Sequence, residues 1–263
     1  MLHIFTLGTD IKRIAALKES AALCDYKINY IIPSVWTGYQ DKLFYMRDAI
    51  KDISSNDIIC FVDAYDVIAY GSEDELVSKF KEHNCDFLIS CEANCYPGEF
   101  SDKHPILNTK SVYKYINSGT YIGYQHAIHE FLNWKSVDEI KQYCREGTDQ
   151  YYLMSYFLEY YKTKRIVLDY GQTIFQVMYG ISWHDFEIAD GRVYNTILKT
   201  MPCFLHFNGE SNLTHISADI LLTFVEKTHL SLTTGKTCTF KEFRPKYNTY
   251  GGWRAQLTPH PKT

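Results

Sequence analysis

The chain places two carboxylates directly after an unbroken apolar segment. Residues 58–62, IICFV, are all apolar, and Asp63 and Asp66 follow before the sequence turns apolar again. A continuously apolar strand, as opposed to an alternating one, indicates a sheet that is covered on both faces. Ligands of open α/β sheets bind at the carboxyl ends of the strands, so both aspartates stand where chemistry is expected. This segment therefore constrains the fold and the site together.

Apolar strands alternate with helical patterns through the first half of the chain. We expect strands at 2–7, 27–32 and 58–62, with helical patterns at 11–24 and 39–51 between them. Such alternation implies right-handed crossovers between parallel strands. The sequence therefore predicts an α/β fold whose sheet is flanked by helices.

The elements that follow are marked by caps and by glycine. Ser72 and Glu75 have the spacing of a capping box and predict a helix over 73–82. Further strands are expected at 86–92, 115–124, 165–170 and 202–207, and a loop leading into a helix within 144–161. A glycine inside the strand at 115–124 indicates a bulge or a close approach of the backbone to another group.

Composition excludes several classes of protein. A length of 263 residues allows one large α/β domain or two small ones, and we expect one. A net charge of −4 argues against a nucleic-acid partner. The eight cysteines contain no C-x-x-C pair, so no zinc site is expected. With no 18-residue apolar segment and a first strand in place of a signal peptide, we expect a soluble protein, cytoplasmic rather than in the secretory lumen.

The two aspartates allow three interpretations. Neighbouring carboxylates repel, and a bound divalent cation such as Mg²⁺ or Mn²⁺ keeps both ionised and in turn binds nucleotide phosphates. Alternatively, one aspartate begins a turn and the other caps it, with no metal. The third interpretation is a phosphatase whose apolar strand ends in D-x-D, with the first aspartate as nucleophile. The spacing of Asp63 and Asp66, two residues rather than one, disfavours the phosphatase.

Five ordered blocks then carry a family resemblance. FVDAYDV, LISCEANCYP, YINSGTYIGY, TDQYYL and FLHFNG together resemble the glycosyltransferase domain of the lysyl hydroxylases, the procollagen-lysine dioxygenase family, over residues 3–212. The resemblance implies a GT-A type fold with a Rossmann-like, mixed and mostly parallel sheet. We expect a transferase domain at 1–240 and an irregular tail at 241–263. Nothing resembles that family's iron- and 2-oxoglutarate-dependent hydroxylase domain, so a stand-alone transferase is expected.

The resemblance also implies a metal site and a nucleotide site. The metal ligands fall on Asp63, Asp66 and His206, and a nitrogen ligand beside two carboxylates suits Mn²⁺ better than Mg²⁺. From the residues alone, His206 would be a core histidine and Tyr65 a core tyrosine; the resemblance makes Tyr65 the ring on which uracil stacks. The implied nucleotide contacts are Leu7, Gly8, Trp36, Lys42, Asp63, Tyr65, Asn208 and Gly209. The family's next lysine is replaced by Asn212.

Two residues are implied to act on the donor sugar. Asn117 matches a sugar-contacting asparagine, whose amide offers paired donors and acceptors to hydroxyls. Asp149 and Gln150 match the end of an acidic loop that is a run of aspartates in the family and only EGTDQ here. The alternative for Asp149 is a helix N-cap. Tyr96 stands where the family has a tryptophan and would be a smaller gate.

The implied activity is transfer of glucose from UDP-glucose to galactosyl-hydroxylysine of a collagen-like chain, with Mn²⁺ and with retention. One alternative is a hydroxylysine galactosyltransferase that uses UDP-galactose. Another is a non-catalytic module that binds a UDP-sugar or a collagen-like chain, which the thinned acidic loop favours and the complete metal and sugar positions disfavour. The expected partners are the donor and a glycosylated collagen-like peptide; a homodimer is left open.

Overall fold

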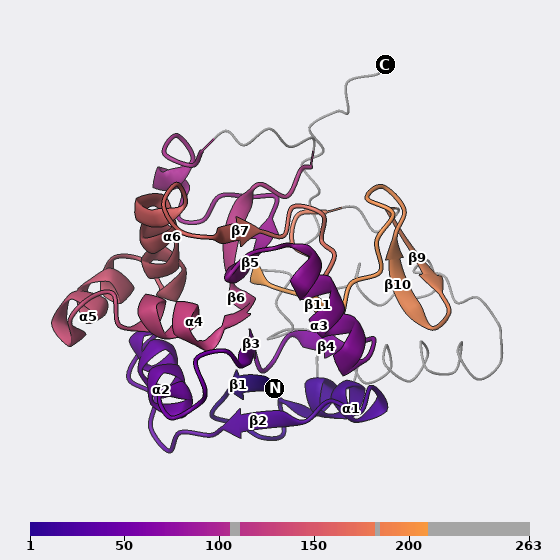
Figure 1. Ribbon diagram of the computed structural model, residues 1–263, viewed down its shortest axis with the longest axis horizontal. Coiled ribbons are helices and arrows are strands. Elements are labelled where there is room, and N and C mark those ends of the chain that lie inside the picture. The colour runs from indigo at the N-terminus through magenta and orange to yellow at the C-terminus, as the bar shows by residue number, and fades with distance from the viewer. Residues whose placement is uncertain (106–110, 182–184, 210–263) are drawn as a thin grey trace, which may run out of the picture.

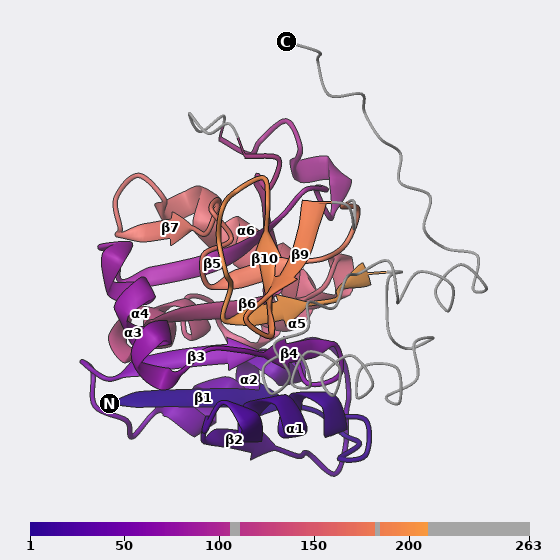
Figure 2. The same ribbon diagram turned by 90° about the vertical axis from the view of Figure 1, so that its right-hand side faces the viewer.

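A six-stranded mixed sheet forms the centre of the protein (Figure 1). The structure, a computed structural model, describes residues 1–105, 111–181 and 185–209. In sheet order the strands are β2 (Ile28–Ile31), β1 (Leu2–Leu7), β3 (Ile58–Val62), β6 (Tyr115–Tyr124), β5 (Phe87–Glu92) and β7 (Ile166–Leu168). Figure 2 shows them running across the view, from β7 at the top to β2 at the bottom. Only β6 is antiparallel to its neighbours, so the predicted mixed, mostly parallel sheet is confirmed.

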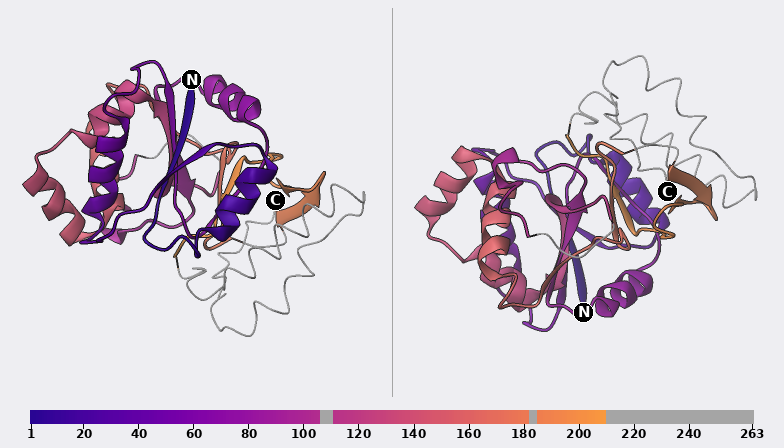
Figure 3. Two further views of the ribbon diagram at one scale, coloured as in Figure 1. Left: turned by 90° about the horizontal axis from the view of Figure 1, so that it is seen from below. Right: turned by 90° about the horizontal axis from the view of Figure 1, so that it is seen from above.

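Helices cover both faces of this sheet (Figure 3). One face carries α2 (Gln40–Ile50), α4 (Gln125–Leu132), α5 (Val137–Glu146) and α6 (Asp149–Tyr160), and the other carries α1 (Ala15–Leu23) and α3 (Glu73–Glu82). Along β3, Ile59 and Phe61 pack into the core beneath the first group of helices, while Cys60 and Val62 pack into the core beneath the second. The apolar run at 58–62 is therefore explained by burial on both sides.

A smaller sheet joins distant parts of the chain beside the central one. Its order is β4 (Val67–Ala69), β11 (Phe204–His206) and β8 (Phe175–Val177), with β11 antiparallel to β4 and parallel to β8. The remaining regular elements are the 3-10 turn η1 (Gly98–Phe100) and the hairpin of β9 (Phe186–Ala189) and β10 (Arg192–Asn195). The β4–β11 pairing places His206 opposite Val67, next to Asp66, so this sheet brings the predicted histidine to the aspartates.

The predicted helix at 73–82 is confirmed as α3, with half of its capping box. Ser72 Oγ accepts a hydrogen bond from the backbone N–H of Glu75 at 3.2 Å. The carboxylate of Glu75 instead accepts from Lys79 and Arg192. Arg192 also donates to the carbonyl of Pro202 at 2.9 Å, and thereby anchors the segment that leads into β11.

Some predicted features fall partly or wholly outside the described residues, among them the end of the domain predicted at 1–240. The tail predicted at 241–263 lies outside them, as does Asn212.

The predicted strands at 2–7, 58–62 and 115–124 coincide with β1, β3 and β6, whereas the helix predicted over 11–24 begins only at Ala15. In the described part of the chain, every helix is too short or too polar to cross a membrane.

Candidate functional site

Three predicted metal ligands meet at the edge of the sheet where β3 ends. Asp63 follows β3, Asp66 precedes β4 and His206 ends β11. His206 Nε2 lies 3.6 Å from Asp63 Oδ2 and 3.4 Å from Asp66 Oδ2, and one ligand atom from each residue falls within 4.8 Å of the others. Ligand atoms that share one small divalent cation at about 2.1 Å stand roughly 3 to 4 Å apart. The spacing therefore suits such a cation.

The environment of His206 supports the same interpretation. The residue is 2% exposed, and neither ring nitrogen has a hydrogen-bond partner among the described residues. The 3.4 Å approach to Asp66 is an ion-pair distance without hydrogen-bond geometry. Burial alone would lower the pKa of His206, but Asp66 and Asp63 outweigh it and raise the pKa. Because buried polar atoms are normally hydrogen-bonded, an Nε2 atom that faces two carboxylates without a hydrogen bond is compatible with a shared cation.

Gly119 on β6 lets the backbone pass directly against this cluster. A Cβ atom at Gly119 would lie 2.0 Å from His206 Cε1 and 2.6 Å from Asp63 Oδ2. The carbonyl of Gly119 accepts the backbone N–H of Asp63 at 2.8 Å. The close approach that the sequence predicts for a glycine within 115–124 is therefore confirmed, and its neighbours are two of the predicted metal ligands.

Lys42 on α2 links the predicted metal ligands to Asp149, which is predicted to contact the donor sugar. Its Nζ lies 2.8 Å from Asp63 Oδ1, 2.7 Å from Asp149 Oδ2 and 3.2 Å from the carbonyl oxygen of Ser118. Burial lowers the pKa of Lys42, but Asp149 and Asp63 outweigh that effect and hold the pKa above its ordinary value. The ammonium is thus charged and already surrounded by protein oxygens. Its contact with a nucleotide stays a prediction.

Asp149 is a buried ion-pair partner and not a helix cap. The N-cap of α6 is Thr148, whose Oγ1 accepts the backbone N–H of Gln150 at 3.1 Å. Asp149 is the first residue of the helix, is 5% exposed and points its carboxylate at Lys42. The N-cap alternative for Asp149 is therefore wrong, because the neighbouring threonine fills that role.

Glu92, which the sequence analysis did not single out, organises the other half of the site. It ends β5, is 3% exposed, and accepts hydrogen bonds from Asn117 at 3.1 Å, Gln150 at 3.0 Å and Asn208 at 3.2 Å. Burial raises the pKa of Glu92, and these amides only partly offset it. The available signal was a carboxylate at the end of an apolar strand, the same signal that identified Asp63.

The structure places the predicted uracil-stacking tyrosine beside the end of β1. The hydroxyl of Tyr65 accepts the backbone N–H groups of Thr9 at 2.6 Å and Asp10 at 3.0 Å, and the guanidinium of Arg13 lies 4.3 Å from the ring centre. A Cβ at Gly8 would lie 3.1 Å from the Tyr65 ring. The ring is half-buried, and its stacking on a base stays a prediction.

The remaining predicted contacts lie around this region at differing depths. Leu7 is buried at the end of β1, and Trp36 is exposed in the loop before α2. Gly209 has a φ of 73°, and a Cβ there would lie 2.9 Å from the ring of Tyr179. Tyr96 is exposed, and its carbonyl accepts from the Gln150 amide at 2.7 Å. Their contacts with a nucleotide or sugar stay predictions.

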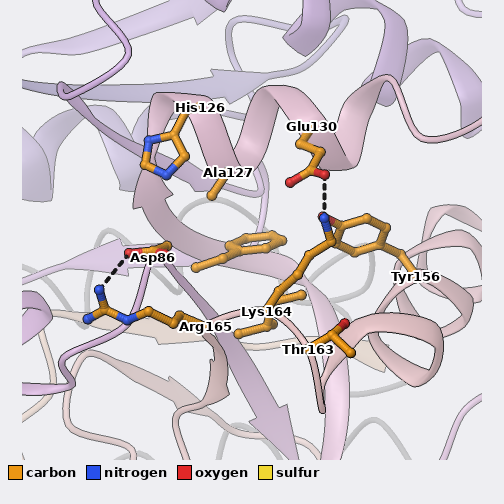
Figure 4. A pocket seen from close by; sticks show the side chains of 10 residues that line it. Asp86, His126, Ala127, Glu130, Tyr156, Thr163, Lys164 and Arg165 are labelled. Carbon is orange, nitrogen blue, oxygen red and sulfur yellow. Dashed lines mark hydrogen bonds and ion pairs between the residues drawn. The ribbon is translucent and has the colours of Figure 1, made fainter.

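A cavity of about 310 Å³ lies at the opposite edge of the sheet, where β5 and β7 begin (Figure 4). Its charged walls are paired with each other: Asp86 with Arg165 at 3.4 Å, and Glu130 with Lys164. Phe87 contributes to its apolar lining. None of the predicted site residues lines this cavity, so it is separate from the candidate site.

Comparison with known proteins places the chain among its relatives. A family model described as the PLOD GT domain matches residues 33–231. The multifunctional procollagen lysine hydroxylase and glycosyltransferase of Caenorhabditis elegans is 31% identical over 232 residues, which cover 80% of this chain and 30% of that protein. The human protein LH3 of the same description is 31% identical over 163 residues, covering 59% and 21%. Uncharacterized protein R699 of Acanthamoeba polyphaga mimivirus is 31% identical over 164 residues, covering 61% and 33%. The chain spans a third or less of each of these relatives.

Solved structures show the same architecture. The galactosyltransferase LgtC, in complex with donor and acceptor sugar analogs, superposes with a TM-score of 0.53 at 12% identity, covering 94% of this chain and 100% of LgtC. A second LgtC structure, of an active-site mutant, gives a TM-score of 0.51 at 11% identity and covers 86% and 96%. At such low identity the likeness concerns the fold, and it confirms the predicted GT-A type α/β fold.

Proposed function

This chain belongs to the PLOD family of glycosyltransferase (GT) domains, and from that premise we propose that it is a metal-dependent transferase that uses a UDP-sugar donor. The observation that carries the proposal is the buried imidazole of His206, whose Nε2 faces Asp63 and Asp66 without a hydrogen bond among the described residues. Polar burial of this kind is costly without a ligand. Asp63, Asp66 and His206 would hold Mn²⁺, with Mg²⁺ as the second choice.

The cation, when bound, would offset the negative charge that develops on the departing diphosphate. The chain's own residues do the rest. Asp149, held by Lys42, would face the positive charge that develops on the transferring sugar. Asn117 is oriented from both sides, because its Oδ1 accepts the N–H of Gly119 at 3.0 Å while its Nδ2 donates to Glu92. An amide fixed in this way is suited to hold sugar hydroxyls in one pose.

For the substrates, we propose glucose transfer from UDP-glucose to galactosyl-hydroxylysine in a collagen-like peptide, with retention at the anomeric carbon. The support is the description of the relatives, which pairs procollagen lysine hydroxylase with glycosyltransferase. The first alternative is galactose transfer from UDP-galactose to bare hydroxylysine. The second is a binding module without turnover, favoured by the shortened acidic segment EGTDQ around Asp149.

One experiment separates these three readings. The protein is incubated with Mn²⁺ and either UDP-glucose or UDP-galactose, together with galactosyl-hydroxylysine or hydroxylysine, and the products are identified by mass and by anomeric NMR coupling. We expect an α-linked glucosyl-galactosyl product that disappears in excess chelator. Galactose found only on bare hydroxylysine would identify the galactosyltransferase. Binding of UDP with no product from any pair would identify the binding module.

Asp149 provides the first testable prediction for the catalytic step. Asp149→Asn should lower turnover by about 100-fold and leave UDP affinity nearly unchanged, because the carboxylate acts mainly in the transition state. Asp138→Asn is the matched control, since Asp138 also lies in the first turn of a helix but is exposed. Normal turnover in Asp149→Asn, measured beside UDP calorimetry, would remove this residue from the mechanism.

A further inference from the structure

Lys42 is enclosed between Asp63, a predicted metal ligand, and Asp149, which is predicted to contact the donor sugar. It is 7% exposed, and its three nearest oxygens belong to Asp63, Asp149 and Ser118. Its ammonium also lies 4.8 Å from the ring centre of Phe61. An ammonium has three hydrogens, and here three protein oxygens lie within hydrogen-bonding distance. Little donor capacity is left for a phosphate.

We propose that Lys42 is a positioning residue that serves as a fixed counter-charge of the metal site, and that it does not bind the donor directly. In this role it holds Oδ1 of Asp63 and the carboxylate of Asp149, and leaves Oδ2 of Asp63 for the cation. The inference rests on the proposed function, because it presupposes a divalent cation at Asp63, Asp66 and His206.

The two oxygens of Asp63 are divided in the way this role requires. Oδ1 lies 2.8 Å from Lys42 Nζ, while Oδ2 faces His206 Nε2 at 3.6 Å. A carboxylate held at one oxygen offers the other to a metal in a fixed direction. Lys42 therefore binds Oδ1 of Asp63 and thereby orients Oδ2, the oxygen that would bind the metal.

Charge balance points to the same role. The carboxylates that face Lys42 or His206 belong to Asp63, Asp66 and Asp149 and bring three negative charges, and Lys42 brings one positive charge, so two negative charges remain around the predicted cation position. That remainder equals the charge of one divalent cation. Glu92 instead accepts hydrogen bonds from three side-chain amides. Without the ammonium, the site would hold one more negative charge than the cation neutralises, and Asp149 would be buried without a partner.

Removal of Lys42 should therefore move two measurements in opposite directions. The cation should bind more tightly, because a neighbouring positive charge is gone and both oxygens of Asp63 are free. Turnover should fall, because Asp149 loses the group that positions it. A residue that only supported the local structure would, on removal, weaken metal binding and turnover together.

The test titrates Mn²⁺ into the full chain and follows the free ion by electron paramagnetic resonance, with turnover measured in parallel. Lys42→Met should tighten Mn²⁺ binding by at least about tenfold. Its turnover should fall by about 100-fold. Lys42→Arg keeps the charge and should keep Mn²⁺ affinity within about threefold of the wild type.

A second pair of variants guards against misfolding. If Lys42→Met does not fold, because Asp149 is then buried and unpaired, the double variant Lys42→Met with Asp149→Asn removes that charge as well. The reference is then Asp149→Asn alone. The double variant should bind Mn²⁺ at least about threefold more tightly than this reference.

The outcomes separate this inference from the proposed function. If the wild type binds Mn²⁺ and turns over a UDP-sugar, but loss of Lys42 leaves Mn²⁺ affinity unchanged or weaker in both backgrounds, the counter-charge role is overturned and the transferase remains. If the wild type shows no saturable Mn²⁺ binding, both are overturned.

Discussion

The cavity where β5 and β7 begin and the site where β3 and β5 end lie at opposite edges of one sheet, and they handle charge differently. In the cavity, Asp86 pairs with Arg165 and Glu130 with Lys164, at partly exposed positions (Figure 4). At the site, the buried carboxylate of Asp149 and the half-buried carboxylate of Asp63 both contact the buried Lys42, while the ring nitrogens of His206 make no hydrogen bond among the described residues.

This difference shows how a ligand site is distinguished from a charged surface. Exposed ion pairs contribute little to stability and are screened by salt, so the paired walls of the cavity need no further explanation. Buried charge costs several kcal/mol per group unless it is compensated, on the order of the whole stability of a domain when several groups gather. The cluster of Asp63, Asp66 and His206, with no hydrogen bond to the imidazole among the described residues, supports the cation site that we propose.

The strongest test of this contrast removes one charged group from each edge. Asp66→Ala and His206→Ala should each abolish Mn²⁺ binding and lower turnover by at least about 100-fold, because the leaving diphosphate loses its counter-ion. Glu130→Gln, at the other edge, should leave turnover unchanged and cost less than about 1 kcal/mol in unfolding free energy. Circular dichroism checks that each variant is folded. An equal loss of turnover in Glu130→Gln would show that the two edges of the sheet do not differ in function.

The next test adds a single methyl group to the site. Gly119→Ala should weaken Mn²⁺ binding by at least about tenfold and cost about 1–3 kcal/mol in stability, because its Cβ would occupy the space of the His206 ring. Gly98→Ala is the matched control, since a Cβ there has no neighbour within 4 Å. A Gly119→Ala protein with wild-type Mn²⁺ affinity would show that His206 need not stay where the structure places it.

A smaller effect is expected at the nucleotide side of the site. Tyr65→Ala should weaken UDP binding in the presence of Mn²⁺ by about 1 kcal/mol, because it removes a stacking surface. Tyr65→Phe keeps the ring and should retain most of the affinity. Calorimetry with UDP and GDP measures both variants, and equal affinity of the wild type for GDP would argue against a uridine pocket.

The smallest effect concerns how stability depends on pH. Burial raises the pKa of Glu92 above its ordinary value of 4.5, so its folded state binds the proton more tightly than its unfolded state. Its contribution to stability is therefore greatest below about pH 4.5 and is lost as the pH rises through the raised pKa. Glu92→Gln should flatten this decline in thermal unfolding scans.

Glu139 supplies a control of opposite sign. Its side-chain hydrogen bond with Ser136 lowers the pKa of Glu139, so its stabilisation is present above about pH 4.5 and is lost as the pH falls. Glu139→Gln should flatten the acid limb instead. The same change of slope in both variants would mean that burial does not set the behaviour of Glu92.

Local sequence patterns predicted the strands of the central sheet and the helices α1, α2, α3 and α6. They missed α4 and α5, and residues 144–146, predicted as part of a loop, are the end of α5. The apolar run at 58–62 and the small residues of 115–124 matched β3 and β6. At α6, either Thr148 or Asp149 is a suitable N-cap by residue type, and spacing alone does not choose between them. The choice was made by Lys42, more than a hundred residues away, which pairs with Asp149 and leaves the cap to Thr148.

By itself, the sequence determined the strands of the central sheet, the helices α1, α2, α3 and α6, and the position of Asp63 and Asp66 at a strand end, because hydrophobic period and caps act over a few residues. Local patterns made His206 a core histidine, and only the tertiary structure decided that it lies beside Asp66. The same holds for the hydrogen bonds that Glu92 accepts from three amides and for those that Lys42 donates to protein oxygens. Those contacts join residues far apart in the chain. Their strength depends on burial and on distances of a few ångströms, and neither is written in the local order of residues.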